Sequence, residues 1–213
     1  MELRDLSKIR NEYRLGVLDE RHMIPDPMEQ FSLWMAQAVE ARVEEPTAMA
    51  LATVSDEGLP SARIVLLKGA DADGLVFYTN YLSRKGRDLE NNPHAALVFH
   101  WKELERQVRV EGPVEKVLEK VSDDYFAVRP EESKITAIVS PQSAVVPDRQ
   151  YLMDLKEGYL EARRGRHVRP GHWGGYRLVP DKMEFWQGRP GRMHDRILYS
   201  RAGNTWKRVR LAP

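Results

Sequence analysis

Five short runs between residues 47 and 117 alternate with a period of two, and this pattern constrains the fold more than any other feature of the chain. The runs are AMALATVS, SARIVLLKG, LVFYTN, AALVFHW and RQVRVEGPVEKV, with the turn sequences DEG, DADG and NNP among them. β-Branched and aromatic residues favour strands, whereas clusters of Gly, Asp, Asn and Pro favour turns. Five strands in succession predict an antiparallel meander or a small barrel.

A helix is predicted before these strands. Asp26 is a candidate N-cap, Pro27 suits the first helical position, and Glu29 follows the cap by three residues. An apolar stripe at helical spacing extends this helix to about residue 44, and it consists of Phe31, Trp34, Met35 and Ala38. A shorter amphipathic helix is predicted over residues 3–13, before Gly16.

Further helices are predicted between and after the strands. One begins at Ser83 in SRKGRDLENNP, and others follow in VSDDYFAVRP, EESKITAIVS and DRQYLMDLKEGYLEAR. The tail returns to strands in WGGYRLVPDKMEFWQG and in RILYSRAGNTWKRVRLAP, a hairpin that turns near residues 202–204. The whole pattern predicts one α+β domain built on an antiparallel sheet.

The composition excludes several classes of protein. Thirty-three basic and 32 acidic residues give a net charge of +1, so no global field draws the chain to nucleic acid or to a membrane. The absence of cysteine excludes disulfides, thiolate nucleophiles and thiolate metal sites. The N-terminus lacks the apolar core of a signal peptide, and no apolar run approaches the roughly 20 residues of a membrane helix. We therefore expect a soluble, cytoplasmic protein.

The candidate binding residues are cations that stand beside hydroxyl or amide side chains. Neither G-x-G-x-x-G nor G-x-x-x-x-G-K-[ST] nor H-E-x-x-H occurs, and the six histidines are scattered, so we expect no metal site. Arg84 and Lys85 fall in the first turn of a predicted helix, where free N–H groups favour an anion. The alternative for any one such residue is a solvated surface cation.

Two spacing arguments limit how these cations can cooperate. Arg63 and Lys68 would lie on opposite faces of a regular strand, so two anions or a bulge would be needed to use both. The apolar residues between them, 64–67, are predicted to be core. Tyr125, Arg129 and Ser133 are four residues apart and share a helix face only if the helix continues through Pro130, which proline disfavours.

Several long motifs resemble, in order, the pyridoxine/pyridoxamine 5′-phosphate oxidase family. They are RNEYRLG, RIVLLK, FYTNYLSRKGRDLENNP, LERQVRVEG, YFAVRPEES, SPQS, WGGYRLVPDKMEFWQG, RMHDRILY and the terminal W-x-x-x-R-L-x-P, and together they span residues 10–213. The resemblance implies an antiparallel Greek-key split β-barrel with flanking helices. It also implies flavin mononucleotide (FMN) as cofactor and a homodimer with FMN at the subunit interface. We expect a single domain over residues 1–213, with a mobile cover at 1–25, barrel strands at 47–117 and 172–213, and helices at 118–165.

The resemblance also assigns site residues. The implied FMN contacts are Arg63, Ile64, Val65, Leu66, Leu67, Lys68, Tyr78, Thr79, Arg84, Lys85, Gln107, Gln142, Ser143, Trp186 and Arg196. The implied substrate contacts are Arg10, Asn11, Glu12, Tyr13, Lys68, Tyr125, Arg129, Ser133, Arg192, Met193 and His194. Two phosphate-bearing ligands would resolve the conflict over Arg63 and Lys68, because each cation can serve a different one.

The implied reaction oxidises pyridoxine 5′-phosphate and pyridoxamine 5′-phosphate to pyridoxal 5′-phosphate, with hydride transfer from C4′ to flavin N5 and O₂ giving hydrogen peroxide. Arg192 and His194 are the implied catalytic residues, and His194 is either a base or an orienting partner. Asp195 either steadies its neighbours or forms a salt bridge to Arg196. Alternatives to this reaction are a split-barrel flavoprotein with a different small substrate and a non-enzymatic flavin-binding protein.

Three segments depart from the family pattern. TAIVS at residues 136–140 replaces a more usual Gly-Ala-Trp, which affects local packing more than chemistry. The match is thin between residues 145 and 171, and RRGRHVRPGHWGG has Arg169-Pro170 in place of a proline pair. That basic run could indicate nucleic-acid binding, but no aromatic residue interleaves with its cations, and we expect an arginine-rich solvated loop instead.

Overall fold

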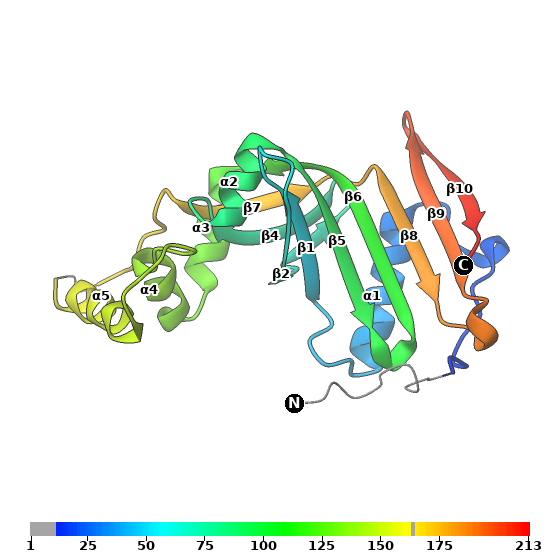
Figure 1. Ribbon diagram of the computed structural model, residues 1–213, viewed down its shortest axis with the longest axis horizontal. Coiled ribbons are helices and arrows are strands. Elements are labelled where there is room, and N and C mark those ends of the chain that lie inside the picture. Colours follow the sequence, from blue (N-terminus) through cyan, green and yellow to red (C-terminus); the bar gives the residue numbers. More distant parts are fainter. Residues whose placement is uncertain (1–11, 163–164) are drawn as a thin grey trace. The chain divides into compact units, whose positions relative to one another are not determined.

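The computed structural model describes residues 12–162 and 165–213 (Figure 1). The chain divides into two compact units. The first combines the N-terminal region up to Pro46 with Val98–Val110 and Asp181–Pro213, and the second combines Thr47–Leu97 with Glu111–Pro180. The single-domain expectation stays a prediction. The helix predicted over residues 3–13 falls almost wholly on residues 1–11, outside the described residues.

Helix α1 (Pro27–Glu40) belongs to the first unit and begins as predicted. The Asp26 carboxylate accepts hydrogen bonds from the backbone N–H groups of Met28 and Glu29, which have no partner within the helix. Three residues of the apolar stripe, Phe31, Trp34 and Ala38, are buried, and Met35 is half-buried. The ring centroids of Phe31 and Phe99 lie 5.1 Å apart. The helix ends at residue 40 rather than near 44, because Arg42 adopts a left-handed conformation with φ 55°.

The strands of the first unit form an ordered antiparallel array. Strand β8 (Lys182–Gln187) pairs with β9 (Asp195–Ala202), and β9 pairs with β10 (Thr205–Leu211). On its other side, β8 neighbours β6. Figure 1 shows β8, β9 and β10 side by side, and the predicted hairpin turns at Gly203, which has φ 62°. Short 3₁₀ turns cover Glu20–His22 (η2), Lys102–Leu104 (η3) and Pro190–Arg192 (η4).

The second unit contains the remaining strands in two connected paths. Strands β5 (His94–Trp101) and β6 (Arg106–Lys116) contribute to both units. Strand β2 (Pro60–Leu66) pairs with β1 (Ala48–Val54), which neighbours β5. Strand β4 (Gly74–Asn80) pairs with both β3 (Gly69–Asp71) and β7 (Trp173–Leu178), and β7 also pairs with β6. A plain meander is therefore wrong, because strands far apart in sequence are neighbours.

Four helices complete the second unit. They are α2 (Arg84–Asn91), α3 (Glu119–Val128), α4 (Glu131–Val139) and α5 (Arg149–Ala162). The Ser83 hydroxyl accepts from the Gly86 N–H at 3.3 Å, which confirms the predicted start of α2. Pro130 separates α3 from α4, so one continuous helix does not form. Among the described residues, no helix is long and apolar enough to cross a membrane.

One expectation about burial is wrong. Residues 64–67 were expected to be core, yet Ile64 is 67% exposed and Leu66 is 39% exposed. The reason is that β2 lies at the end of its strand path, with β1 as its paired neighbour. Leu67 alone among the four is buried.

The basic run before β7 is not simply a solvated loop. Arg169 donates to the Asp123 carboxylate at 2.6 Å and to the Trp173 carbonyl at 2.7 Å. The buried His167 ring lies between the Tyr159 hydroxyl and Glu131, each at 2.8 Å. Asp123, Glu131 and Tyr159 lie in helices α3, α4 and α5, and Trp173 begins β7, so His167 and Arg169 connect three helices of the second unit to its sheet.

Candidate active site

The first cluster of predicted binding residues lies in the second unit, around Arg63. Its guanidinium donates to the Thr53 hydroxyl at 2.7 Å and to the Ser61 hydroxyl at 2.8 Å, and the Asp88 carboxylate lies 3.8 Å away. The side chain is 19% exposed, and burial lowers its pKa, with the positive charge of Arg84 acting in the same direction. Arg84 itself is exposed in the first turn of α2. The charges of Arg63 and Arg84 thus oppose each other, and a bound anion would offset this repulsion.

Lys85 joins three predicted contacts into one polar group. Its Nζ donates to Thr79 Oγ1 at 3.2 Å and to Gln142 Oε1 at 3.0 Å. Burial, and then the charge of Arg63, lower the pKa of Lys85. Gln142 lies in a turn whose next residue, Ser143, has φ 71°. Both effects on the Lys85 pKa would be offset by an anion, because an opposite charge favours the protonated amine.

A cavity of about 280 Å³ adjoins these residues and holds the Arg129 guanidinium. Arg129 lies 4.5 Å above the Trp173 ring, and its Nη1 is the single buried side-chain polar atom of the described residues that lacks a hydrogen-bond partner. Burial lowers the pKa of this arginine. The cavity is lined by Asn80, Arg129, Glu132, Ser133, Thr136, Ala137, Ser140, Gln142 and Trp173. A buried donor without a partner is costly, so the cavity favours an oxygen-rich anion.

The helix break at Pro130 does not separate the predicted substrate residues. Arg129 and Ser133 both line the cavity, because α3 and α4 meet at the proline corner. Tyr125 stacks on Tyr78 with ring centroids 4.0 Å apart, and burial raises the pKa of both phenols. The unusual segment 136–140 forms the end of α4 and supplies three residues of the cavity wall.

Lys68 falls outside the strand on which the parity argument depended. Strand β2 ends at Leu66, and the exposed Lys68 follows the buried Leu67. The strict two-face conflict between Arg63 and Lys68 therefore does not apply.

The second cluster lies in the first unit, around the turn between β8 and β9. The rings of Tyr13, Trp186 and His194 pack together, with centroids 4.7 Å apart for Trp186 and His194 and 5.5 Å apart for Tyr13 and His194. Arg192 has φ 61°, and both Arg192 and Met193 are exposed. Three packed rings and two exposed side chains thus gather around this turn.

The remaining predicted contacts of this unit are placed as follows. Arg196 forms two bonds to the buried Glu184 carboxylate, at 2.8 and 3.1 Å, and this pairing raises the pKa of Arg196. Gln107 is half-buried in β6. Glu12 is exposed and bonds to Arg14, whereas Arg10 and Asn11 lie outside the described residues.

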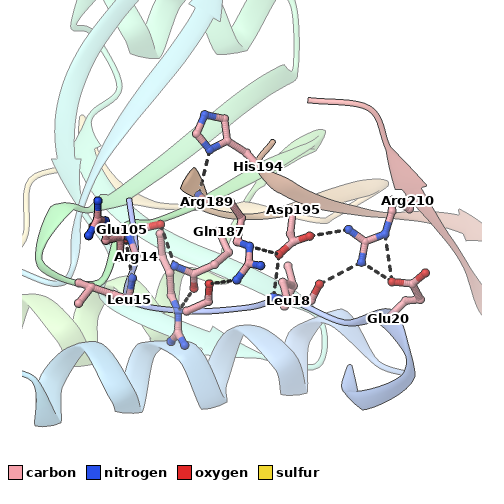
Figure 2. Close-up of polar contacts among 12 residues, drawn as sticks. Arg14, Leu15, Leu18, Glu20, Glu105, Gln187, Arg189, His194, Asp195 and Arg210 are labelled. Atoms are coloured by element: carbon pink, nitrogen blue, oxygen red, sulfur yellow. Dashed lines mark hydrogen bonds and ion pairs between the residues drawn. The ribbon is translucent and has the colours of Figure 1, made fainter. Parts of the chain in front are cut away.

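Asp195 steadies its neighbours rather than pairing with Arg196. Its carboxylate accepts from the Leu18 N–H at 3.0 Å and pairs with Arg210 at 2.7 Å and Arg189 at 3.5 Å (Figure 2). The alternative, a salt bridge from Asp195 to Arg196, is wrong, since Arg196 pairs with Glu184.

Sequence reasoning missed several residues that hold the chain before α1. The Glu105 carboxylate accepts from the backbone N–H groups of Arg14 and Leu15, at 2.7 and 2.9 Å. Arg189 donates to the Gly16 carbonyl at 2.9 Å. Figure 2 shows these contacts converging from segments far apart in the sequence, and no local signal marks them.

The elements define an α+β protein of the split β-barrel class, as expected. Residues 35–154 match the family described as pyridoxamine 5′-phosphate oxidase, and residues 173–213 match the pyridoxine 5′-phosphate oxidase C-terminal dimerisation region. The chain belongs to the pyridoxine/pyridoxamine 5′-phosphate oxidase family. The residues between the two matches, 155–172, coincide except for residue 172 with part of the segment 145–171, where the sequence resemblance is thin.

Individual relatives agree with this membership. The chain is 54% identical over 212 residues to a pyridoxine/pyridoxamine 5′-phosphate oxidase of Burkholderia mallei (strain SAVP1), covering 98% of this chain and 99% of the relative. It is 55% identical over 209 residues to one of Cupriavidus necator, with the same coverage. A solved structure, PhzG from Burkholderia lata 383 in complex with tetrahydrophenazine-1-carboxylic acid, aligns with a TM-score of 0.87 at 33% identity, covering 93% of this chain and 99% of that one.

Proposed function

We propose that this chain oxidises pyridoxine 5′-phosphate and pyridoxamine 5′-phosphate to pyridoxal 5′-phosphate, using FMN and O₂. The observation that carries the proposal is Arg129, whose side chain lines a cavity of about 280 Å³ and whose buried Nη1 lacks a hydrogen-bond partner. Identity of 54% over nearly the whole chain to named oxidases supports the same reaction. The C-terminal dimerisation region supports a homodimer, and we place FMN at its subunit interface.

The residues of the second unit fit a phosphorylated flavin. FMN, when bound, accepts a hydride from substrate C4′ and passes electrons to O₂, giving hydrogen peroxide. Lys85, Thr79 and Gln142 already share hydrogen bonds, so their donors are oriented before a ligand arrives. We assign these three, together with Arg63 and Arg84, to FMN and its phosphate.

The substrate phosphate is assigned to Arg129 and Ser133. Arg129 is held over Trp173, so its donors point in a fixed direction at little entropic cost. A phosphate bound far from the reacting carbon supplies binding energy that orients that carbon. Tyr125 joins this group through its stack on Tyr78.

The ring-facing residues are assigned to the turn between β8 and β9. Arg192, Met193 and His194 would contact the pyridine ring, and Tyr13 would cover it. Trp186 and Arg196 are assigned to the flavin. Arg196 keeps its charge while bound to Glu184, and its Nη1 also donates to the Ala212 carbonyl at 2.8 Å, so any contact with the flavin would use the remaining N–H groups of its guanidinium.

The proposal is tested with the purified protein and its visible spectrum. Under anaerobic conditions, pyridoxine 5′-phosphate should bleach the flavin absorbance, and air should restore it with formation of pyridoxal 5′-phosphate. Unphosphorylated pyridoxine at the same concentration is the control. If neither phosphorylated vitamer bleaches the bound flavin, the assigned substrate is rejected and a different small substrate is favoured. The similar protein PhzG, which was solved with tetrahydrophenazine-1-carboxylic acid, gives an example of such a ligand.

Replacing Gly188 by alanine is expected to lower kcat/KM about tenfold, because misplacing a substrate-covering group by an ångström is costly. A Cβ at this position would lie 2.6 Å from Tyr13 Cγ, so the Tyr13 ring must move away from Trp186 and His194. Gly171→Ala is the matched control, since a Cβ there meets nothing within 4 Å. Equal kinetics for the two variants would contradict the placement of Tyr13 at the substrate.

A further inference from the structure

One ring nitrogen of His194 is already committed to the protein. The backbone N–H of Arg189 donates to His194 Nδ1 at 3.1 Å. A backbone amide can only donate, so Nδ1 must present its lone pair, and a neutral imidazole then carries its proton on Nε2. The nitrogen left for a ligand is therefore a hydrogen-bond donor.

The orientation of the ring is also restricted. Trp186 packs on the His194 ring at an interplanar angle of 43°, and Tyr13 meets it edge-on at 74°. Turning the ring over would place a carbon against the Arg189 N–H and lose that hydrogen bond. Packing and hydrogen bonding thus favour the same ring position.

The side chain of Arg189 anchors the backbone that makes this bond. Its Nη1 donates to the Gly16 carbonyl at 2.9 Å, and its Nε lies 3.5 Å from the Asp195 carboxylate (Figure 2). The Arg189 side chain is 33% exposed and the Asp195 side chain 15%, so the pair is partly shielded from water. Arg189 therefore contacts this turn twice: its backbone N–H binds the His194 ring, and its side chain pairs with Asp195, the residue that directly follows His194.

Asp195 and Arg210 also bind residues 12–20, here called the N-terminal strap. Asp195 accepts from the Leu18 N–H, and Arg210 donates to the Leu18 carbonyl at 3.0 Å while pairing with Glu20 and Asp195. Glu105 holds the strap nearer Tyr13, through the N–H groups of Arg14 and Leu15. The strap and the His194 turn therefore share one polar network.

We propose that Arg189 is a positioning residue that fixes His194 as an Nε2–H donor and links this state to the seated strap. His194 then orients an acceptor atom of the substrate and does not remove a proton from it. The identity of that substrate rests on the proposed function. The tautomer and its dependence on Arg189 do not.

The first test measures the tautomer without any turnover. Nitrogen-15 spectra of the purified full-length protein, labelled in histidine, distinguish a protonated ring nitrogen from an unprotonated one, and His194→Gln identifies the signal. At about pH 8, where a typical histidine is neutral, we expect an unprotonated Nδ1 and a protonated Nε2. Arg189→Ala should shift both signals toward the averaged values of a mixed tautomer.

Arg21→Ala is the matched control for this test. Arg21 belongs to the same unit, but its side chain is 81% exposed and its guanidinium pairs with Asp19 rather than with Asp195. Its spectrum should match the wild type. A protonated Nδ1 in the wild type, or an unchanged His194 signal in Arg189→Ala, would overturn the proposal. Arg189→Lys, which keeps the charge but loses the two-point contact, replaces Arg189→Ala if that variant does not fold.

The second test separates donor from base by kinetics. Glutamine places an amide N–H near the imidazole Nε2 position, whereas asparagine mimics Nδ1, and neither side chain can act as a base. If His194 donates from Nε2, His194→Gln should keep kcat within about tenfold of wild type and exceed His194→Asn. Equal losses of about 100-fold or more in both variants, the size expected for a removed general base, would contradict the donor role. If neither the wild-type protein nor any variant oxidises the substrate, the proposed function is rejected, and the nitrogen-15 spectra still decide which tautomer His194 adopts.

Discussion

Replacing Arg129 by methionine is expected to lower kcat/KM for pyridoxine 5′-phosphate by about 100- to 1,000-fold, because two or more charge-assisted hydrogen bonds to a phosphate are lost. Methionine retains much of the packing on Trp173, which the guanidinium covers at 4.5 Å. The substitution also removes the free-energy cost of a buried hydrogen-bond donor that has no partner in the ligand-free protein. The variant should therefore fold normally, retain FMN and fail in substrate binding.

The kinetic parameters of this variant localise the effect. Most of the loss should be in KM, since the phosphate lies away from the reacting carbon, with a smaller fall in kcat from poorer orientation. Unphosphorylated pyridoxine should be oxidised equally poorly by the variant and the wild type. Steady-state rates with both substrates provide this comparison.

Arg201→Met is the matched control. Arg201 also covers an aromatic ring, that of Trp206 at 4.6 Å, but lies in the β9–β10 hairpin. The same substitution there should leave kcat/KM within about twofold, because Arg201 is neither an FMN nor a substrate contact; gel filtration checks that this change in the C-terminal dimerisation region keeps the oligomeric state. An unchanged kcat/KM in Arg129→Met would remove Arg129 from the substrate site.

Replacing Gly86 by alanine is expected to destabilise the protein by about 3 kcal/mol or more, at the upper end of overpacking effects. A Cβ at Gly86 would lie 2.1 Å from the Tyr81 carbonyl oxygen. That backbone cannot easily retreat, because the Tyr81 N–H donates to the His172 carbonyl at 2.7 Å. Movement of α2 would also displace the adjacent Lys85, so flavin content should fall along with the urea midpoint.

Gly158→Ala provides the opposite case in another helix. Gly158 lies in α5, where a Cβ meets nothing within 4 Å. Alanine there should stabilise the protein by about 0.5–1 kcal/mol through its higher helix propensity. Urea unfolding of both variants, monitored by circular dichroism, measures the change in the free energy of unfolding, which should be negative for Gly86→Ala and positive for Gly158→Ala. Equal free energies of unfolding would contradict the close contact at Gly86.

Local signals predicted most of the secondary structure. Asp26 and Ser83 were recognised as N-caps because a side-chain oxygen satisfies nearby N–H groups whatever the rest of the fold does. Pro130 was recognised as an obstacle for a similar reason, since proline disfavours a helix at the residue before it. The end of α1 was misplaced, because a left-handed turn at Arg42 has no strong local marker.

The candidate site likewise has features that local sequence patterns predict and features that depend on long-range packing. The amino-acid sequence indicated a site for anionic ligands, through cations set beside hydroxyls, and indicated the family through its motifs. The pairing of Arg169, the exposure of Ile64 and the contact of Asp195 with the strap rather than with Arg196 became visible in the three-dimensional structure alone. The bond from Leu18 to Asp195 joins residues 177 positions apart. Such partners are chosen by how whole elements pack, and neither hydrophobic period nor capping pattern carries that information.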